Sequence, residues 1–590
     1  MTYKRPKADA VIVGLGWAGS LMAEELTRAG LDVVVIERGP YEVTHRNFPP
    51  SVAADELRYG ARREALRPPN VQTLTFRNHR SQTALPGRDL SNWVVGYSVG
   101  GAGKHWSANA WRFTPADFTM ATRVKERYSN MQLPEGLIVQ DWGVTYDELE
   151  PHYDRWEKIA GISGKAGVLN GALQPGGNPF EGSRSAEYPT PPLERSRWND
   201  LFHATTEKMG LHPFPIPAGT LGAAYTNPLG INLAPCTYCG FCGFYGCGNW
   251  SKSSPNACVI PALMTRKNFT LLTECTVLKA EKAADGKTVT GVTFIDSDRN
   301  IGFQPADIVI FAAFQFDNVR LMLLSQIGTP YDPATRTGTI GRAYNFQTMS
   351  YGFLYFENEY MNPFISTGAL ATQVDDYNGD NFDHTGLGFI GGAGILALSD
   401  QATPMGMTDR VPAGTKLWGS EWKKAFQHSY QNYAKIQGQG TSYAHAESYL
   451  SLDPNYTDDN GQPLLRMTFE FNENDRRMAR FVRDRIADIC RQSGAKTWEA
   501  MAFPDQPFSP TRAYDSGHTI GGTAMGLDPA TSALNRYQQS WDAHNLFVIG
   551  ASSFPNNAGY NPTGTPSALT LWTAKAIIND YLRQPGLLTR

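Results

Sequence analysis

Apolar and polar positions follow a regular order at the start of the chain. Residues 8–13 form a short apolar run, residues 20–28 repeat apolar positions with a helical period, and residues 33–36 are again apolar. Short apolar runs bounded by turn residues are typical of buried parallel strands. We therefore predict a strand, a helix and a second strand parallel to the first.

Strand and helix signals return later in the chain. A strand at 307–313 precedes a helix at 316–325, and a last strand at 546–552 precedes a helix at 567–582. Strands at 269–272, 277–280 and 288–296 are predicted to form a meander with a turn at Asp285-Gly286. Two separate helices are predicted at 146–159 and 198–209. Because the strand–helix pattern stops and resumes, the domain that it builds is predicted to be discontinuous.

Two stretches differ from this pattern. Residues 346–510 alternate aromatic and polar positions and contain a charged helix at 474–493, which favours an antiparallel sheet backed by helices. Residues 40–90 are polar and contain prolines, so we expect an irregular excursion over the surface. The predicted fold class is α/β, with a discontinuous Rossmann-like domain (1–115, 216–345 and 511–590), a connecting region (116–215) and an inserted α+β substrate domain (346–510).

The first predicted strand ends in a glycine turn, Gly14-Leu15-Gly16-Trp17-Ala18-Gly19. The first glycine allows a tight turn, the second lets backbone approach a pyrophosphate, and the third lets helix and strand pack closely. The helix N-terminus offers free N–H groups to phosphates. Glu37 ends the next strand, eighteen residues beyond Gly19, where it can bind a ribose. An ordinary strand-to-helix turn is the alternative, but it would not need Glu37.

Composition and charge narrow the function classes. A chain of 590 residues is too long for one simple hydrophobic core. Its content of 41% hydrophobic and 18% charged residues fits a globular protein. A net charge of −3 gives no electrostatic case for nucleic acid or an anionic membrane surface. No apolar run reaches the roughly 18 residues of a membrane span. The first residues have no apolar signal-peptide region, so we expect no secretion signal on the chain itself.

A second glycine-rich loop spans residues 93–106 and ends in His105-Trp106. Four glycines within eight residues allow its backbone to lie against a flat or charged ligand, although a simple turn is the alternative. Together with the first turn and Asn109-Ala110-Trp111-Arg112-Phe113, this loop resembles the glucose-methanol-choline (GMC) oxidoreductase superfamily, whose members bind FAD. In pyranose oxidases of that superfamily the matching histidine is linked covalently to the flavin. The resemblance makes His105 the candidate for such a link; the alternative is a histidine that packs over the flavin ring.

The superfamily resemblance implies a set of FAD-binding positions drawn from distant segments. They are Gly14, Gly16, Trp17, Ala18, Gly19, Glu37, Arg38, Gly100, Gly101, Gly103, His105, Trp106, Asn109, Ala110, Val277, Ala312, Gly550, Ala551, Asn561, Pro562 and Thr563.

The last 80 residues hold the catalytic candidates. Residues 517–526 and Asn561-Pro562-Thr563 resemble the superfamily's histidine segment and the segment before its C-terminal helix. If the roles in the superfamily apply at the matching positions, His518 is the general base and Asn561 is its partner. Imidazole, with a pKa near 6.5, can accept a hydroxyl proton near neutral pH while a hydride leaves for the flavin. The alternative for His518 is a histidine that packs in the core without a catalytic role. His544, in a turn, is a weaker candidate for the general base.

Four of the seven cysteines, Cys236, Cys239, Cys242 and Cys247, lie within twelve residues. Thiols interleaved with glycines favour an iron–sulfur cluster over zinc, disulfides or free thiols. Flavin subunits of bacterial fructose and FAD-glucose dehydrogenases carry a 3Fe–4S cluster on Cys-x5-Cys-x3-Cys. The spacing from Cys236 to Cys242 matches, Cys247 follows one residue late, and Cys239 is spare, so a four-iron cluster stays open.

The resemblance extends to function. The cysteine spacing and the chain length are most like the flavoprotein subunits of gluconate 2-dehydrogenases, which favours D-gluconate oxidised at C2. Another sugar, polyol or keto acid is the first alternative, and an electron-transfer flavoprotein without a substrate is the second. The relatives join a small subunit that carries the export signal and a membrane-anchored multihaem cytochrome c. We therefore expect the periplasmic face of the inner membrane, with the cytoplasm as the alternative.

Overall fold

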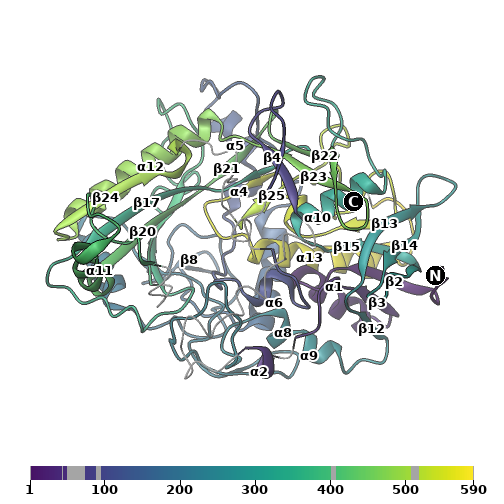
Figure 1. Ribbon diagram of the computed structural model, residues 1–590, viewed down its shortest axis with the longest axis horizontal. Coiled ribbons are helices and arrows are strands. Elements are labelled where there is room, and N and C mark those ends of the chain that lie inside the picture. Colours follow the sequence, from purple (N-terminus) through teal and green to yellow (C-terminus); the bar gives the residue numbers. More distant parts are fainter. Residues whose placement is uncertain are drawn as a thin grey trace.

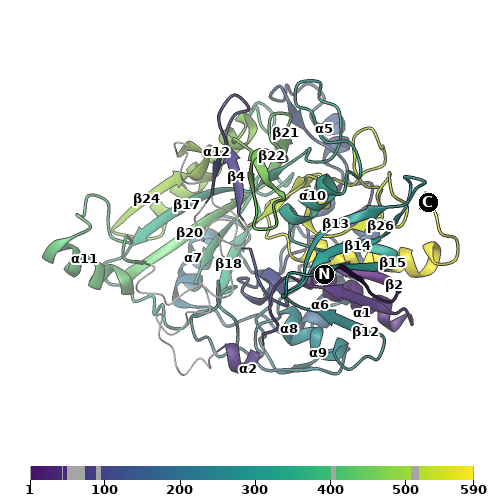
Figure 2. The same cartoon turned by 45° about the vertical axis from the view of Figure 1, so that its right-hand side comes forward.

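The structure is a computed structural model that describes residues 2–42, 44–48, 73–87, 95–399, 407–506 and 517–588. Figures 1 and 2 show two large sheets, one at the right built around the N-terminal strands and one at the left covered by a long helix. Segments from both ends of the chain meet in the right-hand half. Three predicted segments lie partly outside the described residues. They are the loop at 93–106 (residues 93 and 94), the excursion at 40–90 and the last predicted domain segment (residues 511–516).

The right-hand sheet has eight strands, in the order β12-β3-β2-β15-β14-β13, with β1 and β26 also paired to β15. Its parallel part joins β12 (Phe269–Leu272), β3 (Val33–Ile36), β2 (Ala8–Val13), β15 (Ile301–Phe311) and β26 (Leu546–Val548). The first half of β15 pairs with β1 (Thr2–Lys4) and β14 (Val289–Ile295), and β14 pairs with β13 (Thr276–Lys282). The predicted α/β class with a Rossmann-like sheet is thus confirmed.

Helices cover this sheet because their apolar positions repeat on one side. In α1 (Trp17–Arg28), Leu21, Met22 and Leu26 are fully buried. Helix α13 (Gly564–Ala576) lies against both α1 and α6 (Tyr146–Ala160) and continues as a π-helical turn, Ile577–Tyr581. Helix α10 (Gln315–Leu324) follows β15. The four predicted helices in these regions begin and end within a few residues of their expected bounds.

The left-hand sheet is antiparallel, in the order β24-β17-β20-β19-β18-β9. Its strands are β24 (Thr497–Ala502), β17 (Thr348–Tyr355), β20 (Tyr433–Gly440), β19 (Ala393–Leu398), β18 (Ala371–Val374) and β9 (Phe214–Pro215). Helix α12 (Glu473–Gln492) packs tightly on one face, since a Cβ on Gly438 would lie 2.5 Å from Val482. The opposite face of β20 is left for the cavity described below.

A four-stranded sheet corrects one expectation. It has the order β22-β23-β4-β5, and it joins β22 (Tyr449–Thr457), β23 (Pro463–Thr468), β4 (Leu74–Arg77) and β5 (Leu85–Pro86). The expectation of an irregular excursion is therefore wrong for residues 73–87. The parallel partner β23 and the burial of Leu74 and Phe76 stabilise β4, and neither is visible in the local sequence.

A second correction concerns Phe269–Leu272. We predicted it as a strand of the meander, but as β12 it pairs in parallel with β3 at the edge of the right-hand sheet. The remaining short elements are α2 (Thr44–Asn47), α4 (Pro115–Phe118), α5 (Met120–Arg127), β6 (Leu137–Ile138), β7 (Val168–Leu169), β8 (Ala172–Leu173), α7 (Arg197–Lys208), β10 (Tyr225–Thr226), β11 (Asn232–Leu233), α8 (Pro255–Cys258), α9 (Ile260–Leu263), β16 (Asn345–Phe346), α11 (Gly419–Asn432), β21 (Ser442–His445), β25 (Thr519–Ile520) and β27 (Asn556–Asn557).

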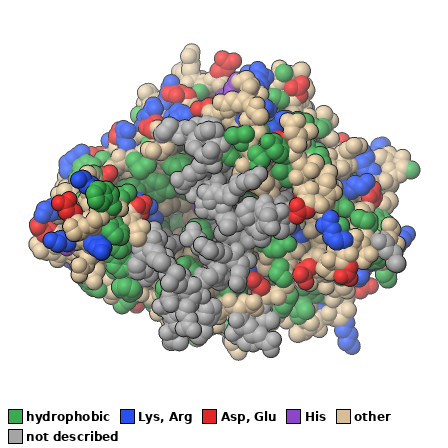
Figure 3. Space-filling view, in the orientation of Figure 1, with side chains coloured by type: hydrophobic (Ala, Val, Ile, Leu, Met, Phe, Trp, Pro, Cys, Tyr) green, Lys and Arg blue, Asp and Glu red, His purple; other side chains and the backbone are tan. Residues whose placement is uncertain are grey.

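The surface agrees with the balanced charge of the sequence. On the face shown in Figure 3, acidic and basic side chains are interspersed rather than gathered into a basic stripe. Among the described residues, no helix combines the length and apolar character needed to cross a bilayer.

Candidate functional site

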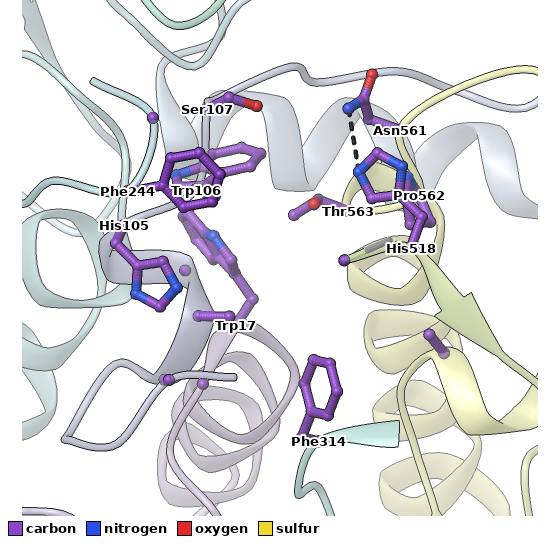
Figure 4. A pocket seen from close by; sticks show the side chains of 18 of the residues that line it. Trp17, His105, Trp106, Ser107, Phe244, Phe314, His518, Asn561, Pro562 and Thr563 are labelled. Atoms are coloured by element: carbon purple, nitrogen blue, oxygen red, sulfur yellow. Dashed lines mark hydrogen bonds between the residues drawn. The ribbon is translucent and has the colours of Figure 1, made fainter. Parts of the chain in front are cut away.

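A cavity of about 690 Å³ lies between the two large sheets. The turn after β2, the loop at 96–109 and the start of α13 line one part of it, and the exposed face of β20 lines another. Figure 4 shows His105, Trp106 and Trp17 on one side of this space and His518, Asn561 and Pro562 on the other. Residues predicted from both ends of the sequence thus meet around one space.

The three glycines of the first turn have different surroundings. Gly14 has a φ of +97°, and a Cβ there would lie 2.9 Å from the Ala312 carbonyl oxygen. A Cβ on Gly19 would lie 2.1 Å from the Gly14 carbonyl oxygen, so α1 could not approach the turn with any side chain at this position. A Cβ on Gly16 would meet only the Gly100 carbonyl oxygen at 4.0 Å, which leaves its backbone open to the cavity.

Glu37 closes the end of β3 beside this turn. Its Oε2 accepts a hydrogen bond from the Leu15 N–H at 3.0 Å, and its Oε1 accepts one from the Gly39 N–H at 2.9 Å. Burial raises the pKa of this carboxyl. The next residue, Arg38, forms an ion pair with Asp317 at 2.8 Å. The carboxylate is therefore held in place on the cavity wall by two backbone donors.

The second glycine loop is attached to the first turn. The Gly100 N–H donates to the Leu15 carbonyl at 2.9 Å, and Gly100 and Gly101 have φ angles of +95° and +53°. A short 3-10 helix, Gly101–Lys104, then brings buried His105 to the cavity. The Lys104 ammonium contacts Glu42 and Ser98.

His518 and Asn561 lie side by side in the structure. Asn561 Nδ2 is 3.2 Å from His518 Nε2, and His518 Nδ1 is 2.6 Å from Gln347 Oε1. The Gln347 amide NH₂ donates to the carbonyls of Ala558 and Tyr560, so its oxygen must face the histidine. An amide oxygen only accepts hydrogen bonds, so Nδ1 carries the proton and Nε2 keeps a lone pair.

Two further features keep His518 neutral. Gln439 also donates to Gln347 Oε1, at 2.8 Å, so the amide oxygen is fixed by two donors. Burial lowers the pKa of His518 to about 4, because the charged imidazolium loses hydration there. At neutral pH the ring therefore presents an unprotonated Nε2 beside the cavity, as a general base requires.

Most of the positions predicted to bind FAD line the cavity. They are Gly14, Gly16, Trp17, Ala18, Glu37, Arg38, Gly101, Gly103, His105, Trp106, Asn109, Val277, Ala312, Gly550, Ala551, Asn561, Pro562 and Thr563. Gly19, Gly100 and Ala110 do not line it. The first two support its wall, and the Ala110 N–H donates to the Pro217 carbonyl.

Several cavity residues were missed by sequence reasoning. Gln439, Gln437 and Lys435 line the cavity from β20. Gln347 immediately precedes β17 and contacts His518, and Arg410 lies over Phe353 of β17. Alternation at 433, 435, 437 and 439 would have indicated a strand with one polar face. Nothing local shows that this face meets His518.

The cavity fits a flavin dinucleotide. Four buried polar atoms on its lining residues, Trp17 Nε1, Asn109 Oδ1, Gln315 Oε1 and Thr519 Oγ1, have no hydrogen-bond partner among the described residues. Buried polar atoms are normally paired, so these favour a polar ligand between them. The open backbone at Gly16 and the N-terminus of α1 suit a pyrophosphate.

The four-cysteine loop does not support the predicted cluster. All seven cysteines are free, and in the described part of the chain, which includes this loop, no three His, Cys, Asp or Glu side chains converge closely enough to hold a metal ion. Burial, followed by the neighbouring thiol groups, raises the pKa of Cys236 to about 12 and that of Cys239 to about 11. The buried Lys252 ammonium donates to the carbonyls of Cys242, Tyr245 and Trp106 at 2.8, 2.6 and 2.9 Å, which fixes the loop to the cavity wall.

Comparison with known proteins agrees with this geometry. Two family models described as GMC oxidoreductase match residues 216–347 and 444–570. The chain is 42% identical to the gluconate 2-dehydrogenase flavoprotein of Pantoea cypripedii, over 99% of this chain and 95% of that protein. It is 24% identical to the fructose dehydrogenase large subunit of Gluconobacter japonicus, over 98% and 99% of the two chains. The crystal structure of pyridoxine 4-oxidase from Mesorbium loti shares the fold, with a TM-score of 0.60, 16% identity and coverage of 96% and 99%.

Proposed function

This chain belongs to the GMC oxidoreductase family and is an FAD-dependent dehydrogenase of CH–OH groups, and we propose that its substrate is a sugar acid, with D-gluconate oxidised at C2 to 2-dehydro-D-gluconate. The 42% identity to a gluconate 2-dehydrogenase flavoprotein over nearly both whole chains supports this substrate. Other sugars, polyols and keto acids are the alternatives for the same site.

The observation that carries the proposal is the contact between His518 and Asn561 on the cavity wall. His518 Nε2, unprotonated at neutral pH, accepts the proton of the substrate hydroxyl. The Asn561 amide N–H donates to the same hydroxyl oxygen and orients it without competing for the proton. When bound, FAD supplies the acceptor for the hydride that leaves the carbon.

Distant segments of the chain would hold FAD. The turn at Gly14 and Gly16 with the N-terminus of α1 would bind the pyrophosphate, and Glu37 would bind a ribose hydroxyl. His105 would carry a covalent flavin link. Its position across the cavity from His518 supports this, because the link and the base then act on opposite sides of the ligand (Figure 4).

We further propose that electrons leave through partner subunits. The fructose dehydrogenase relative is itself a large subunit, which supports the presence of a partner subunit. We propose that the partners are a small subunit with an export signal and a membrane-anchored cytochrome c at the periplasmic face. The loop at 236–247 would have to rearrange to ligate an iron–sulfur cluster, so no electron-transfer step is assigned to it. Iron quantitation with EPR on anaerobically purified protein tests that cluster, and fractionation of native cells tests the location.

A substrate panel tests the proposal directly. The holoenzyme is mixed anaerobically with gluconate, glucose, fructose, sorbitol or 2-ketogluconate and an artificial electron acceptor. We expect gluconate to bleach the flavin spectrum and to yield 2-dehydrogluconate. Flavin reduction by a neutral sugar alone would refute the sugar-acid assignment, and reduction by none would favour an electron-transfer flavoprotein.

A further inference from the structure

The cavity contains more cationic than anionic side chains, and the excess lies along one sheet. Four Arg and Lys side chains line it, of which two are already neutralised. Arg38 pairs with Asp317 and Arg320 pairs with Asp458, both at 2.8 Å. The other two cations, Lys435 and Arg410, lie where the left-hand sheet lines the cavity.

Lys435 lies on the cavity face of β20. Successive side chains of a strand alternate between faces, and Tyr433, Lys435, Gln437 and Gln439 all line the cavity. Gln439 contacts the amide that holds His518, and the Gln437 amide donates to Gln439 at 3.3 Å. Lys435 is the next residue on this face, and its ammonium has no ion pair or hydrogen bond among the described residues.

Arg410 lies over Phe353, the residue beside Lys435 on the same face of the sheet. Its guanidinium carbon is 5.0 Å from the centre of the Phe353 ring. Phe353 on β17 is the register partner of Lys435 on β20. Side chains directly opposite each other in an antiparallel pair have Cβ atoms about 4.5–5.5 Å apart and share a face. The two cations therefore occupy adjoining positions.

No cavity-lining carboxylate neutralises this pair. Of the described residues that line the cavity, only Glu37 and Asp317 carry carboxyl groups, and both are already bound near the glycine turn. Asp409 approaches Arg410 Nε at 3.6 Å but is largely exposed, and Glu499 lies opposite Phe353 on β24. Neither of these two lines the cavity. Two adjoining cations without an internal counterion create a positive potential that favours an anionic ligand.

We propose that Lys435 and Arg410 form an anion-binding subsite of the cavity that captures the carboxylate of a sugar acid on its way to His518. This inference rests on the proposed oxidation of a sugar acid and deepens it by naming the residues that select the acid. Charge-assisted bonds from ammonium and guanidinium groups replace the hydration that the carboxylate loses on entry. A sugar alcohol of the same length gains nothing from these cations, so the subsite discriminates against it.

The test compares D-gluconate with its neutral six-carbon counterpart, D-glucitol. Steady-state KM values with an artificial acceptor and equilibrium binding by calorimetry are measured on holoenzyme of the wild type, Lys435→Met, Lys435→Arg and Arg410→Met. Lys423→Met, an exposed lysine on α11 outside the cavity, is the charge-matched control. FAD content is measured in each variant so that cofactor loss is separated from substrate loss.

We expect Lys435→Met to raise the KM and Kd for gluconate about 10-fold or more, Arg410→Met to do so less, and Lys435→Arg to restore most of the affinity. Values for glucitol should change less than 2-fold, and the wild-type KM for gluconate alone should rise with salt. An unchanged gluconate-to-glucitol ratio in both Met variants would overturn the subsite.

The binding measurement separates this inference from the proposed function. Gluconate that binds in a Lys435-dependent way without being oxidised would support the subsite and refute the proposed reaction. Gluconate that neither binds to nor is oxidised by the wild type would refute both. If Lys435→Met fails to fold, the salt dependence of the wild type and Lys435→Arg still decide the matter.

Discussion

His518 Nδ1 lies 2.6 Å from Gln347 Oε1, so a neutral amide, not a carboxylate, orients the proposed base. The distinction matters because an amide fixes the tautomer without stabilising the charged ring. Gln347→Glu should raise the His518 pKa, and the acid limb of the kcat/KM profile should move up by about one pH unit or more. Gln347→Leu should lower kcat about 10–100-fold with a smaller effect on KM.

The matched control for these variants is Gln304→Leu. Gln304 is also buried, and its amide also donates to two carbonyls, those of Pro6 and Pro305, but it lies away from the cavity. It should leave the acid limb unchanged. If the acid limb of the kcat/KM profile lies at the same pH in Gln347→Glu and in the wild type, Gln347 does not set the protonation of His518.

His518 itself should be required for turnover but not for flavin binding. We expect His518→Ala to lower kcat by roughly 10²–10⁴-fold while the flavin absorbance is retained. In the wild type, kcat/KM should fall only as the pH approaches the lowered pKa of about 4, because the base is neutral above it. Turnover of His518→Ala near the wild-type rate would remove this residue from the mechanism.

His105 is expected to hold FAD covalently. Mass spectrometry of the denatured wild type should then show the added mass of the flavin, and His105→Ala should show the polypeptide mass alone. His544→Ala, in a turn outside the cavity, is the control and should keep the added mass. A wild-type mass without flavin would leave His105 as a residue that only packs beside the ring.

Alanine substitutions at two glycines of the first turn should affect different properties, one the stability of the fold and the other the affinity for FAD. Gly19→Ala places its Cβ 2.1 Å from the Gly14 carbonyl oxygen, so it should lower the midpoint of thermal unfolding even without FAD. Gly16→Ala meets only the Gly100 carbonyl oxygen at 4.0 Å, so the apoprotein should stay near wild-type stability while FAD affinity falls about 10-fold or more. Thermal unfolding with and without FAD distinguishes the two. Equal stability losses in both apoproteins would contradict the assigned roles.

Asp375 should make stability depend on pH. This buried carboxyl accepts hydrogen bonds from Tyr560, Gln373 and Asn178, yet burial outweighs them and raises its pKa to about 6. A raised pKa in the folded state means that the stabilisation is complete below the unfolded value of 3.8 and is lost as the pH rises through 6. Asp375→Asn should flatten this decline by an amount on the order of 1–3 kcal/mol in the free energy of unfolding.

Thermal unfolding from pH 4 to pH 7 checks the Asp375 prediction. Asp117 has the same raised pKa of about 6 and keeps part of the slope in the variant. A slope that is identical in wild type and Asp375→Asn would show that Asp375 does not change its protonation in this range.

The parts of the site that depend on local chemistry were predictable from the sequence. The turn at Gly14, the acid at Glu37 and the histidine loop at His105 each have a short motif with a physical role. The resemblance to GMC oxidoreductases, confirmed by the family models and the relatives, added the pairing of His518 with Asn561. The close approach of these two side chains agrees with that expectation.

The rest depended on contacts between distant segments. Gln347 and Lys435 have no motif, and their roles follow from the register of β17 and β20 and from which face α12 covers. Strand β4 escaped prediction because its partner β23 lies nearly 400 residues away in the chain. For the thiol loop, spacing favoured a metal site that the described side chains do not form in this structure, so the iron–sulfur cluster stays a prediction.

The origin of the cavity walls has a consequence for how the holoenzyme is made. Lining residues run from Val13 in the first parallel strand to Ser567 in the last long helix, and β26, which pairs with β15, is among the last strands synthesised. A nascent chain therefore lacks a complete flavin site until the segment that contains Ser567 has left the ribosome. Once bound, the flavin stabilises contacts between the two ends of the polypeptide, and the size of this effect depends on flavin supply in the cell.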